Sequence, residues 1–215
     1  ELEKADNFEA ALSTLIRREL AAHRRILFNG NGYSEEWPLE AARRGLLNLR
    51  STPEALIHYT DEKNVALFAR HGVYTRTEIQ SRQDINMEEY AKIIHIEALT
   101  LIDMLGKLIV PACAAYSKQL AEGVAAKAGI GVDAPAEAAQ VRLLTEKTAE
   151  LIERTERLKA VVAAEPEGLN ARAMYEHEAV IPAMEAARQV ADELEGRVGK
   201  EYWPIPSYAD LLFYV

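Results

Sequence analysis

Between residues 141 and 162, side chains suited to a protein interior recur every three or four positions without a break. This spacing places them on one side of an α-helix. A repeat of this kind is a heptad seam, which favours packing against neighbouring helices at about +20°. The sequence therefore predicts a long helix buried along one side. The seam consists of Val141, Leu144, Thr148, Leu151, Thr155, Leu158 and Val162.

A longer helical pattern precedes this seam, from Thr75 to about Ala128, and contains no strong turn signal. Thr75 and Glu78 have the spacing of a capping box, in which each side chain satisfies a free amide at the helix start. Pro111 is expected to kink the helix because it cannot donate a hydrogen bond to the carbonyl of Lys107. The predicted buried stripe contains Tyr90, Ile94, Leu101, Leu105, Leu108, Ala112, Tyr116, Leu120 and Val124.

A third long helix is predicted over about residues 170–198, with Pro182 as a second kink. The segments "GIGVDAP" and "EPEGLN" separate the three long helices, because glycine and proline break helical patterns. Side chains seven positions apart define the buried side of the third helix: Ala173, Val180, Ala187 and Leu194.

Shorter helices are predicted in the first part of the chain. Apolar residues recur at helical spacing over about residues 2–28, and Asn29-Gly30 suits a left-handed C-terminal cap of that helix. Ser34 is expected to cap a second helix, which ends at Gly45.

Two further boundaries complete the pattern: Thr52-Pro53-Glu54 is typical of a helix start, and Gly72 of a helix stop. We therefore expect an all-α fold in one compact unit. In it, a connector of short N-terminal helices over residues 1–74 leads into an antiparallel bundle of three long helices over residues 75–215. The tail "YWPIPSYADLLFYV" is aromatic and apolar, so it is expected to dock on the bundle.

Composition limits the possible functions. A formal net charge of −9 argues against binding to nucleic acid or to anionic membrane surfaces, since both require basic patches. No apolar run is long enough for a membrane span. The single cysteine, Cys113, fits a reducing compartment, and we expect a cytoplasmic protein. Because the sequence opens in mid-helix pattern without Met, it is interpreted as part of a longer protein.

The segment "FNGNGYSEEW" places two Asn-Gly pairs within four residues, which raises the question of a phosphate loop. It lacks the spacing and the lysine of the G-x-x-x-x-G-K-[ST] motif, and it follows a helix instead of a strand. The preferred interpretation is a helix cap followed by a tight turn.

A metal site in a helical bundle would need Glu-x-x-His on two helices. No acid stands three residues before any of the five histidines. Acids adjoin histidines at His95–Glu97 and Glu176–Glu178, but adjacent helical residues point about 100° apart and do not converge on one ion. Solvated or capping histidines are the preferred interpretation, and no metal site is expected.

Other chemically suggestive residues also have structural interpretations. Cys113 lies in the apolar stretch "IVPACAAY" and is expected in the core, although a cysteine with a distant histidine can form a nucleophile pair. Glu97 and Asp103 interrupt an apolar run. They are expected to pair with an arginine of a neighbouring helix, with a functional or interface role as the alternative. Trp37 and Trp203 are expected to anchor loops.

Four blocks carry a more specific signal. In their order and separations they resemble the C-terminal region of type III glutamine synthetases, the large bacterial form of that enzyme. The resemblance covers nearly the whole chain and is strongest over about residues 24–116 and in the last 14 residues. The blocks are "RILFNGNGYSEEW", "RRGLLNLRSTPEAL", "NVALFARHGVYTRTEIQSR" with "HIEALTLIDML", and "YWPIPSYADLLFYV".

The resemblance implies a parent enzyme that joins glutamate and ammonia with the use of ATP and Mg²⁺ or Mn²⁺. In that family, the catalytic acids and arginines lie on a curved sheet, and no strand pattern is readable here. We therefore expect the catalytic residues upstream of Glu1, and no catalytic, cofactor-binding or metal-binding residue in this chain. The implied partners are the chain's own catalytic domain and the neighbouring subunits of a homo-oligomeric ring.

The resemblance also implies that the Asn-Gly segment is a family-specific connector near a subunit or domain contact. Its residues are Asn29, Gly30, Asn31, Gly32, Tyr33 and Ser34. An approach of Asn29, Asn31, Tyr33 or Ser34 to an active site is an open alternative. For the chain as a whole, the alternatives are a freestanding helical-bundle module for protein interaction, or an enzyme with its own site in the bundle.

Overall fold

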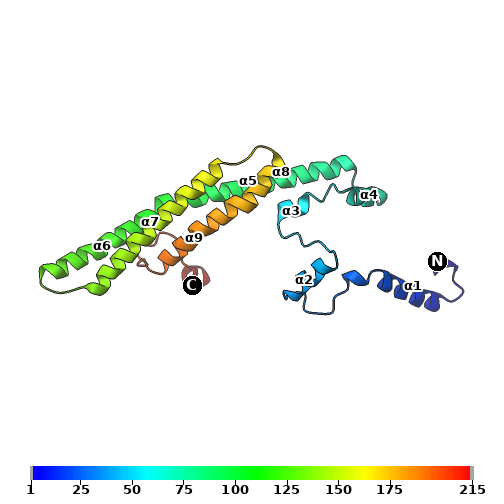
Figure 1. Ribbon diagram of the computed structural model, residues 1–215, viewed down its shortest axis with the longest axis horizontal. Coiled ribbons are helices and arrows are strands. Elements are labelled where there is room, and N and C mark those ends of the chain that lie inside the picture. Colours follow the sequence, from blue (N-terminus) through cyan, green and yellow to red (C-terminus); the bar gives the residue numbers. More distant parts are fainter. Residues whose placement is uncertain (1, 214–215) are drawn as a thin grey trace. The chain divides into compact units, whose positions relative to one another are not determined.

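The computed structural model describes residues 2–213, apart from the side chains of residues 208 and 209. All regular elements in this range are helices, so the predicted all-α class is confirmed (Figure 1). The chain contacts divide it into two compact units, Glu1–Arg50 and Ser51–Val215. The sequence-based division after residue 74 stays a prediction. No helix among the described residues is both long and apolar enough to cross a membrane.

The first unit contains α1 and α2, with short 3₁₀ helices beside α1. The helix predicted over residues 2–28 is interrupted, because the side-chain oxygen of Asn7 accepts a hydrogen bond from the amide of Ala10 at 3.0 Å and so starts a new helix. Gly45 has φ of +70° and ends α2, as predicted. The elements are η1 (Leu2–Lys4), α1 (Phe8–Ala22), η2 (Arg24–Ile26) and α2 (Glu36–Arg43).

The second unit begins with two short helices, α3 (Thr52–Leu56) and α4 (Glu62–Arg70). The predicted start of α3 is displaced by one residue, because Ser51 and Glu54 form the capping box and leave Thr52 inside the helix. The predicted stop of α4 at Gly72 is confirmed by its φ of +62°.

Three long helical segments follow. Thr75 and Glu78 form the predicted capping box at the start of the first segment. The first segment is α5 (Arg76–Met104), the π turn η3 (Leu105–Ile109) and α6 (Val110–Gly129). The second is α7 (Pro135–Ala163). The third is α8 (Leu169–Tyr175), the π turn η4 (Glu176–Val180) and α9 (Ile181–Glu195), and it is followed by α10 (Tyr208–Leu212).

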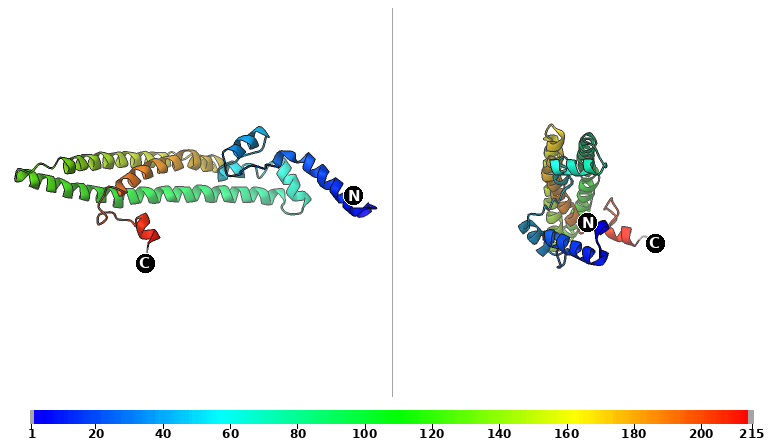
Figure 2. Two further views of the ribbon diagram at one scale, coloured as in Figure 1. Left: turned by 90° about the horizontal axis from the view of Figure 1, so that it is seen from below. Right: turned by 90° about the vertical axis from the view of Figure 1, so that its right-hand side faces the viewer.

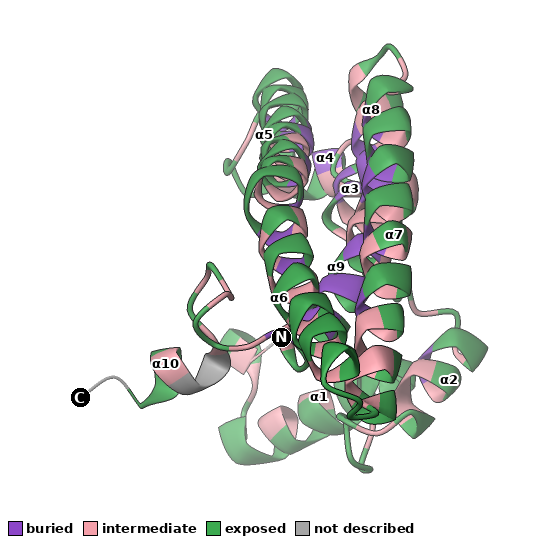
Figure 3. Ribbon diagram, turned by 90° about the vertical axis from the view of Figure 1, so that its left-hand side faces the viewer, coloured by how far each residue is buried: buried purple, intermediate pink, exposed green. Residues whose placement is uncertain are grey.

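The long segments pack side by side, and their buried residues face one another (Figures 2 and 3). Leu144, Leu151 and Leu158 of the predicted seam are fully buried. The four residues predicted on the third segment, from Ala173 to Leu194, are also fully buried. Heptad spacing therefore identified the buried sides of the second and third segments.

Each π turn ends two residues before a proline. The amide of Val110 donates to the carbonyl of Leu105, five residues back, and Pro111 follows. A π turn holds one more residue than an α turn, so the side chains after it move to a different face. Ile109 and Cys113 are therefore buried in place of the predicted Leu108 and Ala112, and Leu108 is 42% exposed.

The first part of the C-terminal tail packs against the core of the second unit. Trp203 and Ile205 contact the cluster around Leu105 and Leu194, so the predicted anchoring role of Trp203 is confirmed. The ring of Tyr202 lies 5.3 Å from that of Tyr116, measured between centroids. The predicted tail extends to Tyr214 and Val215, which lie outside the described residues.

Candidate functional site

The Asn-Gly segment of the first unit forms a tight turn held by its own polar groups. The side-chain oxygen of Asn31 accepts a hydrogen bond from the amide of Tyr33 at 3.0 Å. The Ser34 hydroxyl donates to the carbonyl of Asn31 at 2.8 Å. Ser34 therefore does not cap α2 as predicted, and the residue at the cap position is Glu35.

Gly30 fills a different role from the predicted left-handed cap. Its φ is not positive, since the glycines with positive φ are Gly45, Gly72, Gly131 and Gly168. A Cβ at Gly30 would lie 2.8 Å from one carbon of the Phe28 ring and closer to another. That ring stacks on Trp37 with 4.6 Å between centroids. Glycine is needed here because an aromatic ring occupies the space of its side chain.

Arg44, the residue that follows α2, holds the backbone before the segment in place by hydrogen bonds. Its guanidinium donates to the carbonyls of Leu27 at 2.6 Å and Arg25 at 3.1 Å, and it pairs with Glu40 at 2.5 Å. Hydrogen bonds from Arg43 and Arg44 lower the pKa of Glu40 to about 2. These hydrogen bonds hold the segment against the end of α2, and Trp37 anchors it as predicted.

The second unit brings together a histidine and two carboxylates from three separate elements. His95 belongs to α5, Glu165 to the connection between α7 and α8, and Glu176 begins η4. Nδ1 of His95 lies 3.3 Å from Oε1 of Glu176 and 3.9 Å from Oε1 of Glu165. These three residues are called the His95 cluster below.

The two carboxyl groups of the cluster have opposite electrostatic surroundings. Burial raises the pKa of Glu165, but hydrogen bonds with Arg172 and Glu176, together with the charges of Arg172 and His95, outweigh burial, so the net shift is downward. Nη2 of Arg172 donates to Oε2 of Glu165 at 2.7 Å, and its Nε bonds Oε1. Burial, followed by the neighbouring Glu165 carboxylate, raises the pKa of Glu176. The arrangement therefore favours one ionised and one protonated carboxyl group.

Glu176 is fully buried, and its Oε2 has no hydrogen-bond partner among the described residues. A buried polar atom without a partner is uncommon, since desolvation without compensation costs about 1–3 kcal/mol. The carboxyl group is therefore the chemically unusual element of the cluster.

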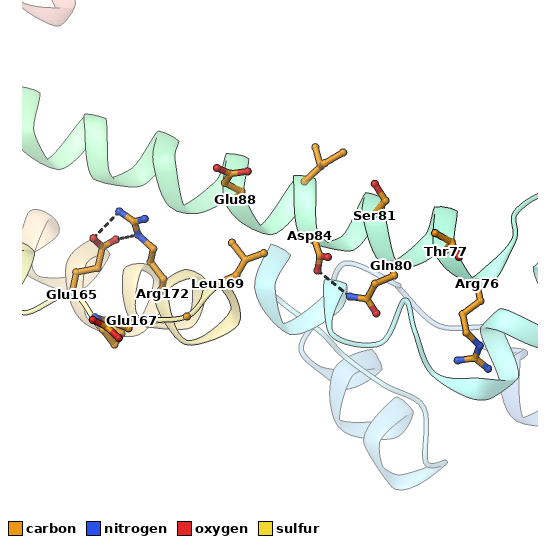
Figure 4. Close-up of a pocket in the computed structure, with 13 residues that line it drawn as sticks. Arg76, Thr77, Gln80, Ser81, Asp84, Glu88, Glu165, Glu167, Leu169 and Arg172 are labelled. Atoms are coloured by element: carbon orange, nitrogen blue, oxygen red, sulfur yellow. Dashed lines mark hydrogen bonds and ion pairs between the residues drawn. The ribbon is translucent and has the colours of Figure 1, made fainter.

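A pocket of about 1000 Å³ borders the cluster on the side of Glu165 and Arg172 (Figure 4). Its other wall is the first part of α5, where Gln80 donates to Asp84 at 2.9 Å. At the far end, Arg76 pairs with Glu62 at 2.5 Å. Glu165 is the member of the cluster that lines this pocket.

The remaining sequence candidates lie apart from the cluster. Cys113 is buried, and burial raises the pKa of its thiol, so the predicted core role is confirmed. Glu97 is exposed. Asp103 pairs with Lys107 one turn along its own helix, so the predicted pairing with an arginine of a neighbouring helix is wrong for Asp103. Both acids point to solvent, where an arginine partner is not required.

Sequence reasoning missed the His95 cluster because it considered only histidines and acids adjacent within one helix. The missing signal was the position of these residues within the heptads. Glu176 stands three residues after Ala173 and four before Val180, both buried. His95 stands four residues after Ala91 and three before Ala98, both also buried.

The described residues thus define an all-α domain of long packed helices, with a tight turn at the Asn-Gly segment and a partly buried cluster of ionisable groups. The chain belongs to the glutamine synthetase C-terminal domain family, whose model matches residues 11–128.

Curated relatives agree with this assignment. The chain is 34% identical to a glutamine synthetase of Butyrivibrio fibrisolvens over 97% of its own length, and 35% identical to a type-3 glutamine synthetase of Dictyostelium discoideum over 98%. It is 32% identical to a glutamine synthetase of Bacteroides fragilis over 99%. In each case the chain spans 30% of the relative. The resemblance to type III glutamine synthetases is confirmed.

Proposed function

We propose that this chain is the C-terminal helical domain of a type III glutamine synthetase, which makes glutamine from glutamate, ammonia and ATP. The family match and the three relatives support the proposal, because they align with nearly all of this chain but with only 30% of their own length. The remaining length of such an enzyme is sufficient for a separate catalytic domain, which we propose precedes Glu1. The proposal includes a cytoplasmic location.

The proposed role is structural: the domain packs on the catalytic domain of its own chain and on neighbouring subunits of a homo-oligomeric ring. The observation that carries this role is the apolar stripe of α1. None of the α1 residues is buried, and Phe8, Ile16 and Leu20 are 56%, 49% and 52% exposed. An amphipathic helix normally gains most of its stability by burying such a stripe. The catalytic domain is its proposed cover.

The second unit supplies the rigid part of the proposed domain. We propose that residues 75–215 form an antiparallel bundle of three long segments with the C-terminal tail docked on it, and that residues 1–74 connect this bundle to the catalytic domain. One core cluster supports this arrangement, because it joins Leu105, Leu151 and Leu194 of the three segments and contacts Trp203 of the tail.

ATP and its Mg²⁺ or Mn²⁺ are proposed to bind outside these residues. The Asn-Gly segment does not fit a phosphate, because the amides of Tyr33 and Ser34 already donate to Asn31. A position near a subunit or domain contact suits this segment better, since the side chain of Tyr33 is fully exposed.

The structural role is tested in the full-length enzyme by replacing Phe8, Ile16 and Leu20 with Ser. The expected result is loss of the native oligomer in sedimentation velocity, with a parallel loss of glutamine synthesis. The matched control replaces Ala10, Arg17 and Ala21 with Ser on the other side of α1, where all three are exposed. Unchanged assembly and activity in the first variant would overturn the proposed role.

A further inference from the structure

We propose that His95, Glu165 and Glu176 bind a divalent transition-metal ion of the Zn²⁺ type. The three side chains offer one nitrogen and two oxygens, all within 4.8 Å of one another, from three separate elements. This site is independent of the structural role proposed above, because that role depends on α1 and this site lies in the second unit.

The distances suit a tetrahedral ion. Bonds of about 2.0–2.2 Å from Zn²⁺ to nitrogen and oxygen place neighbouring ligand atoms roughly 3.3–3.5 Å apart. Nδ1 of His95 is 3.3 Å from Oε1 of Glu176, and 3.9 Å from Oε1 of Glu165. The first pair has the required spacing, and the second reaches it after a shift of roughly half an ångström.

A second observation points to a ligand at the same place. Glu176 is fully buried, and its Oε2 has no hydrogen-bond partner among the described residues. The residue also begins a π turn, a feature that is frequent at functional sites. An ion bound between the two carboxyl groups would replace the proton that links Glu176 to Glu165, and it would compensate the burial of Oε2.

The charges around the cluster are compatible with a divalent ion. Arg172 pairs with Glu165 and also interacts with Glu88. Tyr90 interacts with Glu176 and with the exposed Glu97, and its hydroxyl lies 3.5 Å from Nδ1 of His177. When the Glu176 carboxyl group is protonated, the metal ion displaces its proton. The O–H bond breaks, the bond between oxygen and metal forms, and H⁺ leaves to solvent. Binding is therefore expected to weaken as the pH falls.

The site has a route for entry and a place for a fourth ligand. The side chains of His95 and Glu165 are 27% and 16% exposed, and Glu165 lines the pocket of about 1000 Å³. Water from the pocket would complete four-coordination. Nitrogen donation by His95 favours Zn²⁺ or Co²⁺ over Mg²⁺, which prefers an octahedral shell of oxygens.

The test uses this 215-residue chain after removal of metals with a chelator. Titration with Co²⁺, followed by visible absorption, and with Zn²⁺, followed by calorimetry, is expected to show one saturable site. His95→Gln and Glu176→Gln are each expected to lower the affinity at least roughly tenfold. The matched controls His71→Gln and Glu178→Gln change exposed residues of the same types and are expected to leave the affinity unchanged.

Thermal unfolding provides a second readout. Zn²⁺ is expected to raise the melting temperature of the unaltered chain and of the controls, but not of Glu176→Gln, because a bound ligand stabilises only the folded state that holds it. If Glu176→Gln does not fold, His95→Gln, which alters a partly exposed side chain, decides the question. Absence of saturable binding, or binding that survives His95→Gln, would overturn the proposal without affecting the proposed role of α1.

Discussion

His95 and Glu176 are 81 residues apart in the sequence, yet Nδ1 of the histidine lies 3.3 Å from Oε1 of the glutamate. The contact joins α5 to the π turn η4. The neighbouring core positions on both helices are occupied by apolar residues. The contact places an acid and a histidine at positions that heptad spacing assigns to the interior. A contact between two ionisable side chains therefore interrupts the apolar interior at this point.

The contribution of Glu176 to the free energy of unfolding should decrease as the pH rises, which is opposite to the usual behaviour of a carboxyl group. Burial and the neighbouring Glu165 raise its pKa, so the folded state retains a proton that the unfolded state has lost. In metal-free buffer, its contribution to the free energy of unfolding should fall as the pH rises from the unfolded pKa towards the higher folded pKa. Chemical unfolding of the unaltered chain and of Glu176→Gln at several pH values measures this difference.

Glu176→Gln removes the titration of residue 176 and leaves an amide of similar size that can still donate a hydrogen bond to Glu165. The pKa of Glu165 is shifted downward, so its own contribution has the opposite sign and is lost only at acid pH. His95, His177, Tyr90, Glu88, Glu97 and Arg172 remain in place. Identical pH dependence in the two proteins would contradict the assignment of a raised pKa to Glu176.

Two adjacent residues of α7, one buried in the core seam and one exposed, should differ sharply in how much they contribute to the free energy of unfolding. Leu151 is fully buried, whereas Ile152 is 45% exposed. Leu151→Ala should lower the free energy of unfolding by about 2–5 kcal/mol, because it removes buried methyl groups and leaves a cavity. Ile152→Ala should change it by less than about 1 kcal/mol. Urea unfolding followed by circular dichroism measures both, and similar losses would contradict the heptad assignment.

The sequence predicted the second unit well because heptad spacing reports directly on burial. The residues seven apart on the third segment, such as Ala173 and Leu194, are all fully buried. On the first segment, Leu105 of the predicted stripe is buried, Tyr90, Ile94 and Leu101 are only partly buried beside the buried Ala91 and Ala98, and Leu108 is exposed. Sequence spacing predicts a kink at Pro111, but it does not reveal that the chain inserts a π turn there and changes the register.

The candidate sites were less predictable, because side-chain contacts between distant segments leave no local pattern. The sequence indicated a turn at the Asn-Gly segment but assigned Gly30 to a left-handed cap. The actual constraint is the Phe28 ring, which folds back over Gly30 to stack on Trp37. In the same way, the position of Glu165 beside His95 depends on the path of the connection between α7 and α8.

The proposed location of the catalytic residues outside this chain has a direct test. The isolated chain, incubated with glutamate, ammonia, ATP and Mg²⁺, should form no glutamine above a blank without protein. The described residues form only helices, whereas the catalytic acids of the resembled family lie on a sheet. Glutamine formation by the purified chain that increases with its concentration would contradict the proposed division of the enzyme.

Arg44 should stabilise the connector far more than its neighbour Arg43. Its guanidinium donates to the carbonyls of Arg25 and Leu27, whereas the Arg43 side chain is 77% exposed and pairs with Glu40. Arg44→Gln should weaken protection of residues 25–37 by about 1–2 kcal/mol. Arg43→Gln should have little effect, because exposed ion pairs contribute little. Hydrogen exchange read by mass spectrometry distinguishes the two, and equal protection in both variants would contradict the closing role of Arg44.

Gly30 and Gly32 provide a matched test of the turn itself. A methyl group at Gly30 would overlap the Phe28 ring, whereas no described heavy atom lies within 4 Å of the corresponding position at Gly32. Gly30→Ala should displace the ring from Trp37 and lower local stability by about 1–3 kcal/mol, as overpacking does elsewhere. Gly32→Ala should be neutral or slightly stabilising, since it restricts the unfolded chain. Hydrogen exchange over residues 28–37 measures both variants. Faster exchange in Gly32→Ala than in Gly30→Ala would show that backbone freedom, and not the space taken by Phe28, requires glycine in this turn.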